Sequence, residues 1–210
     1  MNAILQPLFW RLANEQNSDL DVVSVLMPRG EEADKVAIEY AIDVSFKPSI
    51  YHQNPIDLRW SEEDSALFMS LLNKVMNVTE KDIQLDIEDG MVQGLINLVA
   101  TARFHTPWPG DELEGEDFMT YRKEVEVGDL ISINTKYGFY SAVIVALDSI
   151  DATVVLLDDI VSDDIVSSAS ADLSEDEQEV IMPSHSLLIL NRVCVLPAEF
   201  AEDVDASVLH

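Results

Sequence analysis

The chain is short of bases. Only 12 Lys and Arg stand against 40 Asp and Glu in 210 residues, which gives a formal net charge of −28. Polyanions repel such a chain, so the composition excludes direct binding to DNA, RNA or an anionic membrane. Apolar residues nevertheless make up 48% of the sequence. That share is enough to bury a core, and it argues against intrinsic disorder.

Cysteine is almost absent. A single cysteine, Cys194, excludes an intrachain disulfide framework, and its apolar neighbours favour a buried hydrophobic role. The first residues lack a basic start followed by an apolar stretch, so we expect no secretory signal. No apolar run is long enough to span a bilayer. These features predict a cytoplasmic protein, or one of the host cytoplasm if the chain is viral.

Catalytic motifs are also missing. With 7 glycines and 4 scattered histidines, the sequence contains neither a phosphate-binding glycine loop nor a nucleophile beside a base. We therefore expect a non-enzymatic protein with no catalytic residue, no cofactor and no metal ion. A metal-dependent hydrolase remains an alternative, because Mg²⁺ or Ca²⁺ binds converging carboxylates and segments 86–90, 111–117 and 174–179 are dense in acid.

Hydrophobic spacing predicts an α+β domain over residues 1–104. Strict alternation indicates strands, apolar residues every three or four positions indicate helices, and Ser61 followed by three acids is typical of a helix start. The expected elements are, in chain order, a helix at 6–15, strands at 21–27 and 36–46 that pair as a hairpin, a helix at 61–77, a strand at 81–87 and a helix at 91–104.

Residues 105–117 are rich in proline, glycine and acid and have no apolar period, so they are predicted to form a linker. The remainder, 118–210, contains four apolar runs separated by turn signals and is predicted to be all-β.

Part of this second domain resembles the Tudor and related SH3-like small barrels. The similarity covers residues 127–191 and rests on a Val-Gly-Asp opening at 127–129, an aromatic-bearing strand at 137–144 and a third strand that closes on Asp158. It implies an SH3-like β-barrel with an acidic insertion and tail. The predicted fold class is thus α+β, a helix and β-hairpin domain followed by an SH3-like all-β barrel.

The same resemblance implies one candidate site. Tudor-type barrels bind a methylated cation in a cage of aromatic side chains and an acid. Here Tyr137, Phe139 and Tyr140, with Asp158, would fill those roles. The protein would then be an interaction module that binds a basic peptide or tail.

The excess of acidic residues supports a different function. Residues 105–210 hold 23 acids and 4 bases. Duplex DNA carries two charges per base pair, so the whole chain's −28 corresponds to about 14 base pairs. We hypothesise an inhibitor that mimics nucleic acid and occupies the DNA- or RNA-binding groove of a basic partner protein. In charge and size alone the chain resembles phage-encoded anti-restriction and other anti-defence proteins.

That hypothesis needs acids on ordered elements, and the candidates follow strands or precede a possible helical turn. The predicted partner-binding residues are Asp148, Asp158, Asp159, Asp163, Asp164, Asp172, Glu175, Asp176, Glu177 and Glu179. The oligomeric state stays open, although exposed strands of the first domain could pair into a homodimer.

Overall fold

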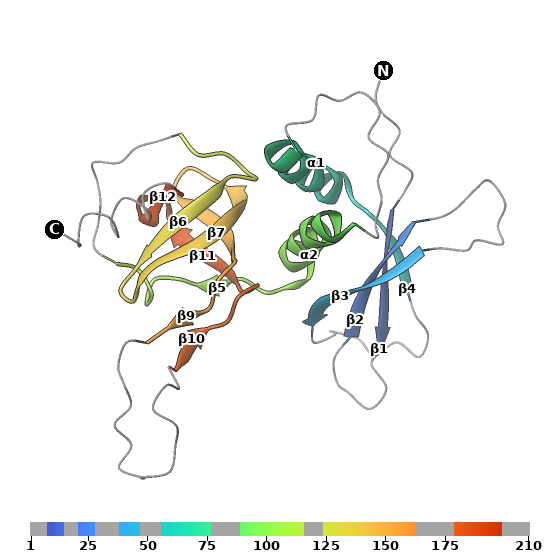
Figure 1. The fold of residues 1–210 in the computed structure, drawn as a ribbon, viewed down its shortest axis with the longest axis horizontal. Helices are drawn as coiled ribbons and strands as arrows, with labels where there is room; N and C mark the ends of the chain where they lie inside the picture. Colours follow the sequence, from blue (N-terminus) through green and yellow to red (C-terminus); the bar gives the residue numbers. More distant parts are fainter. Residues whose placement is uncertain are drawn as a thin grey trace, which may run out of the picture. The chain divides into compact units, whose positions relative to one another are not determined.

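The computed structural model describes residues 8–14, 21–27, 38–46, 56–76, 89–115, 124–162 and 179–198. The chain divides into two compact units, Met1–His105 and Thr106–His210 (Figure 1). Helices and strands in several sheets give a mixed α+β fold, as the sequence predicts.

The first unit combines a four-stranded sheet with two helices. The strand order is β3-β2-β1-β4, with antiparallel neighbours throughout. Both helices lie on the same side of this sheet in Figure 1. The described elements are β1 (Phe9–Asn14), β2 (Asp21–Met27), β3 (Ile38–Phe46), β4 (Ile56–Arg59), α1 (Glu62–Met76) and α2 (Gly90–Phe104).

Most of the periodicity predictions for this unit are confirmed. The expected hairpin forms between β2 and β3, and the segments expected to be helical form α1 and α2. The strand predicted at 81–87 lies outside the described residues.

The helix predicted at 6–15 is wrong, because its described part forms β1. Leu8, Trp10 and Leu12 also alternate along the chain, and as a strand they share one face on which Leu8 and Trp10 are buried. Pairing with β2 on one side and β4 on the other satisfies the backbone of this segment. The short segment fits the periodicity of a helix and that of a strand equally, and pairing with the neighbouring strands makes it a strand.

Four aromatic rings pack between the sheet and the helices. Trp10 of β1 stacks on Trp60 with ring centroids 4.6 Å apart, and Phe104 of α2 meets Trp10 edge-on at 5.6 Å. Phe68 of α1 meets the other tryptophan, Trp60, at 5.6 Å. Such pairs stabilise a core beyond the burial of their area. They join both helices to the central strand.

A buried carboxylate fixes the start of α1 to this cluster. The hydroxyl oxygen of Ser61 accepts a hydrogen bond from the backbone N–H of Asp64 at 3.1 Å, and the Asp64 carboxylate accepts from the Ser61 N–H at 2.9 Å. This is a reciprocal cap that uses aspartate in place of the usual glutamate. The same carboxylate oxygen also accepts from the indole N–H of Trp10 at 3.1 Å.

The second unit is built around one sheet with the strand order β12-β6-β7-β8-β11-β5. Among the described strands β12 and β5 stay at opposite edges, so a closed barrel is not found. The elements are β5 (Trp108–Pro109), β6 (Leu130–Thr135), β7 (Gly138–Leu147), β8 (Asp151–Leu156), β9 (Ile160–Val161), β10 (Val180–Met182), β11 (Leu187–Asn191), the 3₁₀ helix η1 (Arg192–Cys194) and β12 (Val195–Pro197).

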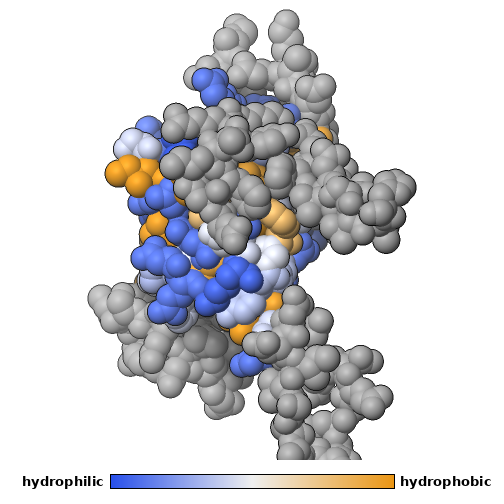
Figure 2. Space-filling view, turned by 90° about the vertical axis from the view of Figure 1, so that its left-hand side faces the viewer, coloured by the Kyte–Doolittle hydropathy of each residue, from blue (hydrophilic) through white to orange (hydrophobic). Residues whose placement is uncertain are grey.

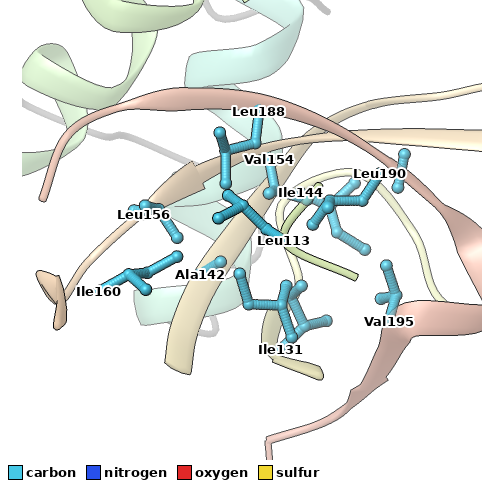
Figure 3. Packing of buried hydrophobic residues seen from close by; sticks show 12 residues of the cluster. Leu113, Ile131, Ala142, Ile144, Val154, Leu156, Ile160, Leu188, Leu190 and Val195 are labelled. Carbon is cyan, nitrogen blue, oxygen red and sulfur yellow. The ribbon is translucent and has the colours of Figure 1, made fainter. Parts of the chain in front are cut away.

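The segment predicted as a linker is folded into this unit over residues 106–115. β5 pairs in parallel with β11, and Leu113 is buried in the hydrophobic cluster of the sheet, where Figure 3 shows its side chain pointing toward the middle. A β-carbon on Gly110 would collide with the side chain of Leu190, and one on Gly115 would lie 2.7 Å from the amide oxygen of Asn134. These glycines permit close backbone approach, and they do not mark a flexible connection.

Asp64→Ala should lower the free energy of unfolding by about 2–3 kcal/mol, because it removes a helix cap and leaves the buried indole N–H of Trp10 without its acceptor. Urea unfolding followed by far-ultraviolet circular dichroism measures this loss. The exposed neighbour in the same turn gives a matched control, since Glu62→Gln should change stability by less than about 0.5 kcal/mol. Equal effects of the two substitutions would contradict the buried cap.

Candidate functional site

The first predicted acid, Asp148, shapes the turn between β7 and β8. One carboxylate oxygen accepts hydrogen bonds from the backbone N–H groups of Ile150 at 2.7 Å and Asp151 at 2.8 Å. These two bonds, with a smaller contribution from the nearby charge of Arg192, hold the pKa of Asp148 below its ordinary value. The side chain is exposed. Asp148 is therefore a surface charge held in place by its own turn.

Asp158 and Asp159 occupy the opposite end of β8. The Asp158 carboxylate accepts from the N–H of Ser141 on β7 at 3.2 Å. The Asp159 carboxylate accepts from the N–H of Ser184 at 2.6 Å, in the turn that precedes β11. Hydrogen bonds from Ser184, and then the proximity of His185, lower the pKa of Asp159. Both acids are exposed and both connect separate segments of the unit.

The last described acid of the predicted set is Glu179, which is exposed just before β10. Its backbone carbonyl accepts from the N–H of Ser162 at 2.9 Å, at the base of the β9–β10 pair. The other predicted acids lie outside the described residues: Asp163, Asp164, Asp172, Glu175, Asp176 and Glu177.

Three of the four described acids of the predicted set form two groups, one at each end of β8. Asp158 and Asp159 are adjacent, while Asp148 precedes the strand that Asp158 follows. The 6 residues of β8, at about 3.3 Å each, separate the two groups by roughly 20 Å. The structure thus brings two of the predicted acids together and holds the third at a fixed distance from them.

Sequence reasoning missed further acids near the start of β6. Glu126 and Asp129 form a turn in which the Asp129 carboxylate accepts from the Glu126 N–H at 2.8 Å. Gly128, at φ 92°, provides the backbone conformation that this turn requires. The Ile144 N–H donates to the carbonyl of Asp129 at 3.1 Å, so the turn lies near the end of β7 that leads to Asp148. The Val-Gly-Asp triplet carried the signal for this turn.

Bases are rare beside these acids. The described residues of the second unit contain two, Lys136 and Arg192. Arg192 donates to the backbone carbonyl of Asp148 at 3.0 Å, and the ammonium group of Lys136 lies 5.1 Å from the ring centroid of Tyr137. On the face drawn in Figure 2, hydrophilic residues spread across the described surface and hydrophobic ones form small separate groups.

The predicted aromatic site is only partly assembled. Tyr140 packs against the hydrophobic cluster, and its hydroxyl accepts from the N–H of Val161 at 3.3 Å, which ties β7 to β9. Phe139 precedes Tyr140 on the same strand, so the two side chains point to opposite faces of the sheet. Tyr137 and Asp158 lie at the same end of the unit as Tyr140. The ring of Tyr137 is in contact with the ammonium group of Lys136.

Comparison with protein-family models and with curated proteins supplies no site that could be transferred. No protein-family model matches the chain, and no curated protein matches it. Within the described ranges, no three His, Cys, Asp or Glu side chains gather as they would around a metal ion. No helix in those ranges combines the length and apolar character needed to cross a membrane. Function therefore has to be inferred from the geometry and charge of the site.

Asp159→Asn should remove a pH-dependent contribution to stability. The pKa of Asp159 is lower in the folded chain than its ordinary value of 3.8, so on acidification the unfolded chain binds the proton first. The carboxylate therefore stabilises the fold above about pH 4, and this contribution is lost as the pH falls through the folded pKa.

Urea unfolding of both proteins between about pH 2.5 and pH 7 tests this expectation. The difference in midpoint should be constant near neutrality and should shrink at the acid end. Asp148→Asn should behave in the same way, because the pKa of Asp148 is also lowered by backbone donors. A difference that persists unchanged at acid pH would rule out the carboxylate as its source.

Proposed function

We propose that the protein is a non-enzymatic inhibitor that occupies the nucleic-acid-binding groove of a basic partner protein. The observation that carries this proposal is the fixed placement of exposed carboxylates. Asp148 and Asp159 accept hydrogen bonds from backbone N–H groups of ordered turns, and Asp158 accepts one from strand β7. A partner binding them would meet charges already in position, which lowers the entropic cost of association.

The spacing of these acids supports mimicry of a phosphate backbone. The separation of roughly 20 Å across β8 equals the length of about six base pairs at 3.4 Å each. Additional acids at the start of β6 add charge at one end. A groove that binds a short duplex or a folded RNA has positive charge over a comparable length.

The balance of charge supports a basic partner over any other kind. Residues 105–210 carry 23 acids and 4 bases, so the field around this unit is strongly negative. Such a field speeds encounter with a positive groove and suppresses binding to acidic surfaces. The partner class we propose is a DNA- or RNA-handling protein, such as one of a host's nucleic-acid-directed defences.

Asp158→Asn combined with Asp159→Asn should weaken partner binding about fivefold, because each exposed charge contributes up to about 1 kcal/mol and asparagine keeps an oxygen that can accept the backbone bond. Binding to a basic protein captured from the native host is measured by interferometry. Glu62→Gln with Glu63→Gln removes two adjacent acids from α1 and should leave the affinity unchanged.

Two further readouts test the proposed mimicry. Duplex DNA or structured RNA should displace the captured partner, since both ligands would use one groove. The affinity should also fall steeply between about 0.05 and 0.5 M salt. Failure of nucleic acid to compete, or an affinity insensitive to salt, would overturn the proposed function.

A second candidate is an SH3-like interaction module that binds a basic peptide. Two observations favour it. The strand order β12-β6-β7-β8-β11, with a 3₁₀ helix before the last strand, is the order expected of an SH3-like sheet. The contact between Lys136 and Tyr137 supports a ring able to receive a cation.

Under this alternative, Tyr137→Ala should abolish binding of a lysine-rich or methyl-lysine peptide, because the ring face is lost. Lys136→Ala should strengthen the same binding, because the competing cation is removed. Titration of a fluorescent peptide measures both effects. The double asparagine variant at 158 and 159 separates the candidates, since mimicry predicts that the acids dominate and the peptide module predicts that Tyr137 does.

A further inference from the structure

Trp108 is far more exposed than the other two tryptophans of the chain. Trp10 keeps 1% of its surface accessible and Trp60 keeps 8%, and the two stack on each other in the core of the first unit. Trp108 lies on β5 of the second unit and keeps 61% of its surface accessible. Tryptophan is enriched among the residues that dominate binding energy at protein interfaces, so this exposure indicates a contact site.

The backbone around Trp108 is held in place on both sides. Pro107 and Pro109 flank it, and a proline restricts the residue before it to an extended conformation. β5 pairs with β11, and the N–H of Gly110 donates to the carbonyl of Ile189 at 2.8 Å. An aromatic side chain on a backbone fixed in this way loses less entropy when it binds a partner.

Two carboxylates follow Trp108 in the same ordered segment. The N–H of Leu113 donates to the carbonyl of Gly110 at 2.8 Å and closes a β-turn. Asp111 and Glu112 are the two central residues of this turn, and both are exposed, whereas Leu113 is buried in the hydrophobic cluster. Steps of at most about 3.6 Å per residue place the backbones of Trp108 and Glu112 within about 14 Å of each other.

An indole ring close to carboxylates suits the side chain of arginine. The planar guanidinium group stacks on an aromatic face and can donate two parallel hydrogen bonds to one carboxylate. Tryptophan offers the best of the aromatic faces for this contact. The compact ammonium group of lysine cannot stack or bind a carboxylate in this paired way. The segment therefore favours arginine over lysine, a distinction that net charge does not make.

This segment adjoins the acids of the proposed binding surface. Trp108 is in register with Leu188, near the start of β11. The turn that precedes β11 contains Ser184, whose N–H donates to the Asp159 carboxylate at 2.6 Å. The negative field of the second unit would draw a basic partner toward this region, and Trp108 would add a short-range contact that fixes specificity.

We propose that Trp108, Asp111 and Glu112 receive an arginine side chain of the basic partner. The source of this arginine rests on the proposed function, because it would belong to the nucleic-acid-binding groove of that partner. Proteins that recognise RNA stack guanidinium planes on unstacked bases. In the complex the indole would take the place of such a base, and the two carboxylates would take the place of phosphates.

Tryptophan emission of the full chain locates the site, since Trp10 and Trp60 are buried and Trp108 is exposed. A short arginine peptide should change this emission, whereas arginine bound to acids elsewhere would leave it unaltered. The arginine peptide should also bind about three- to fivefold more tightly than a lysine peptide of the same length. Fluorescence anisotropy of labelled peptides at about 0.05 M salt measures both dissociation constants.

Variants of the site assign the contributions of the ring and of the acids. Trp108→Ala should abolish the preference for arginine, so that both peptides bind equally. Trp108→Phe should keep part of the preference, because an aromatic face remains. Asp111→Asn combined with Glu112→Gln should weaken the binding of both peptides about threefold, since two exposed charges are lost.

Two matched controls lie outside the site. Ile150→Ala removes an apolar side chain of similar exposure, 63%, from the turn between β7 and β8. Glu62→Gln combined with Glu63→Gln removes two acids from the first turn of α1. Neither variant should change the preference for arginine.

The basic partner captured from the native host separates this inference from the proposed function. Trp108→Ala should weaken its binding about fivefold or more, while nucleic acid still competes. Equal binding of the two peptides to the wild type, a preference that survives Trp108→Ala, or an unchanged affinity of this variant for the partner would overturn the arginine site. A preference that depends on Trp108, with a partner that nucleic acid cannot displace, would support the site and contradict the proposed function.

Discussion

Mutual repulsion among forty carboxylates, with twelve bases to offset them, is the constraint that this fold has to satisfy. The second unit meets it with backbone donors. Asp129, Asp148 and Asp159 each take hydrogen bonds from N–H groups in tight turns. Such bonds are the main cause that favours the charged form of Asp148 and Asp159, and the charges of Arg192 and His185 add less. Asp148 and Asp159 are held in this way and are also exposed, which is the property that a polyanionic binding surface needs.

The first unit treats its acids differently. Of the twelve bases, eight lie in residues 1–104, and two of the described carboxylates there engage specific side chains. Asp57 binds the Arg11 guanidinium, and buried Asp64 joins a helix start to a tryptophan. The described acids of the two units therefore differ in their partners: Asp57 pairs with a base, whereas Asp148, Asp158 and Asp159 accept from backbone N–H groups.

Much of the fold could be read from the sequence wherever a period is long or a cap is explicit. The alternation that ends in Phe46 predicted a strand, and Ser61 with its acids predicted the start of α1. Short segments were ambiguous. Residues 9–14 fit a helix and a strand equally, and only pairing with two neighbours resolved them. The roles of Trp108 and Leu113 in the second unit could not be predicted, because the surrounding glycine and proline suggest a loop. The residues of β11 that they meet also lie far along the chain.

The sequence indicated which types of residue make up the candidate site, but it did not indicate how they are arranged. The pattern of an acid after a strand end singled out Asp148, Asp158 and Asp159, and each of these carboxylates accepts a backbone hydrogen bond. Their binding to a partner stays a prediction. Sequence could not show that β8 separates them, since that depends on which turn each residue closes. Nor could it show that Tyr140 uses its hydroxyl to hold β9, because Val161 lies 21 positions away and no local pattern reports such a contact.

The parallel pairing of β5 with β11 has a consequence for synthesis. Trp108 leaves the ribosome about 80 residues before its partner Leu188, a delay of roughly 4–16 s at usual elongation rates. During that interval Leu113 has no completed cluster to enter, because β8 and β11 are still to come. The first unit can finish folding meanwhile, since all of its residues precede this segment. Nascent chains would therefore carry a formed first unit followed by a segment whose Leu113 still lacks the strands that bury it.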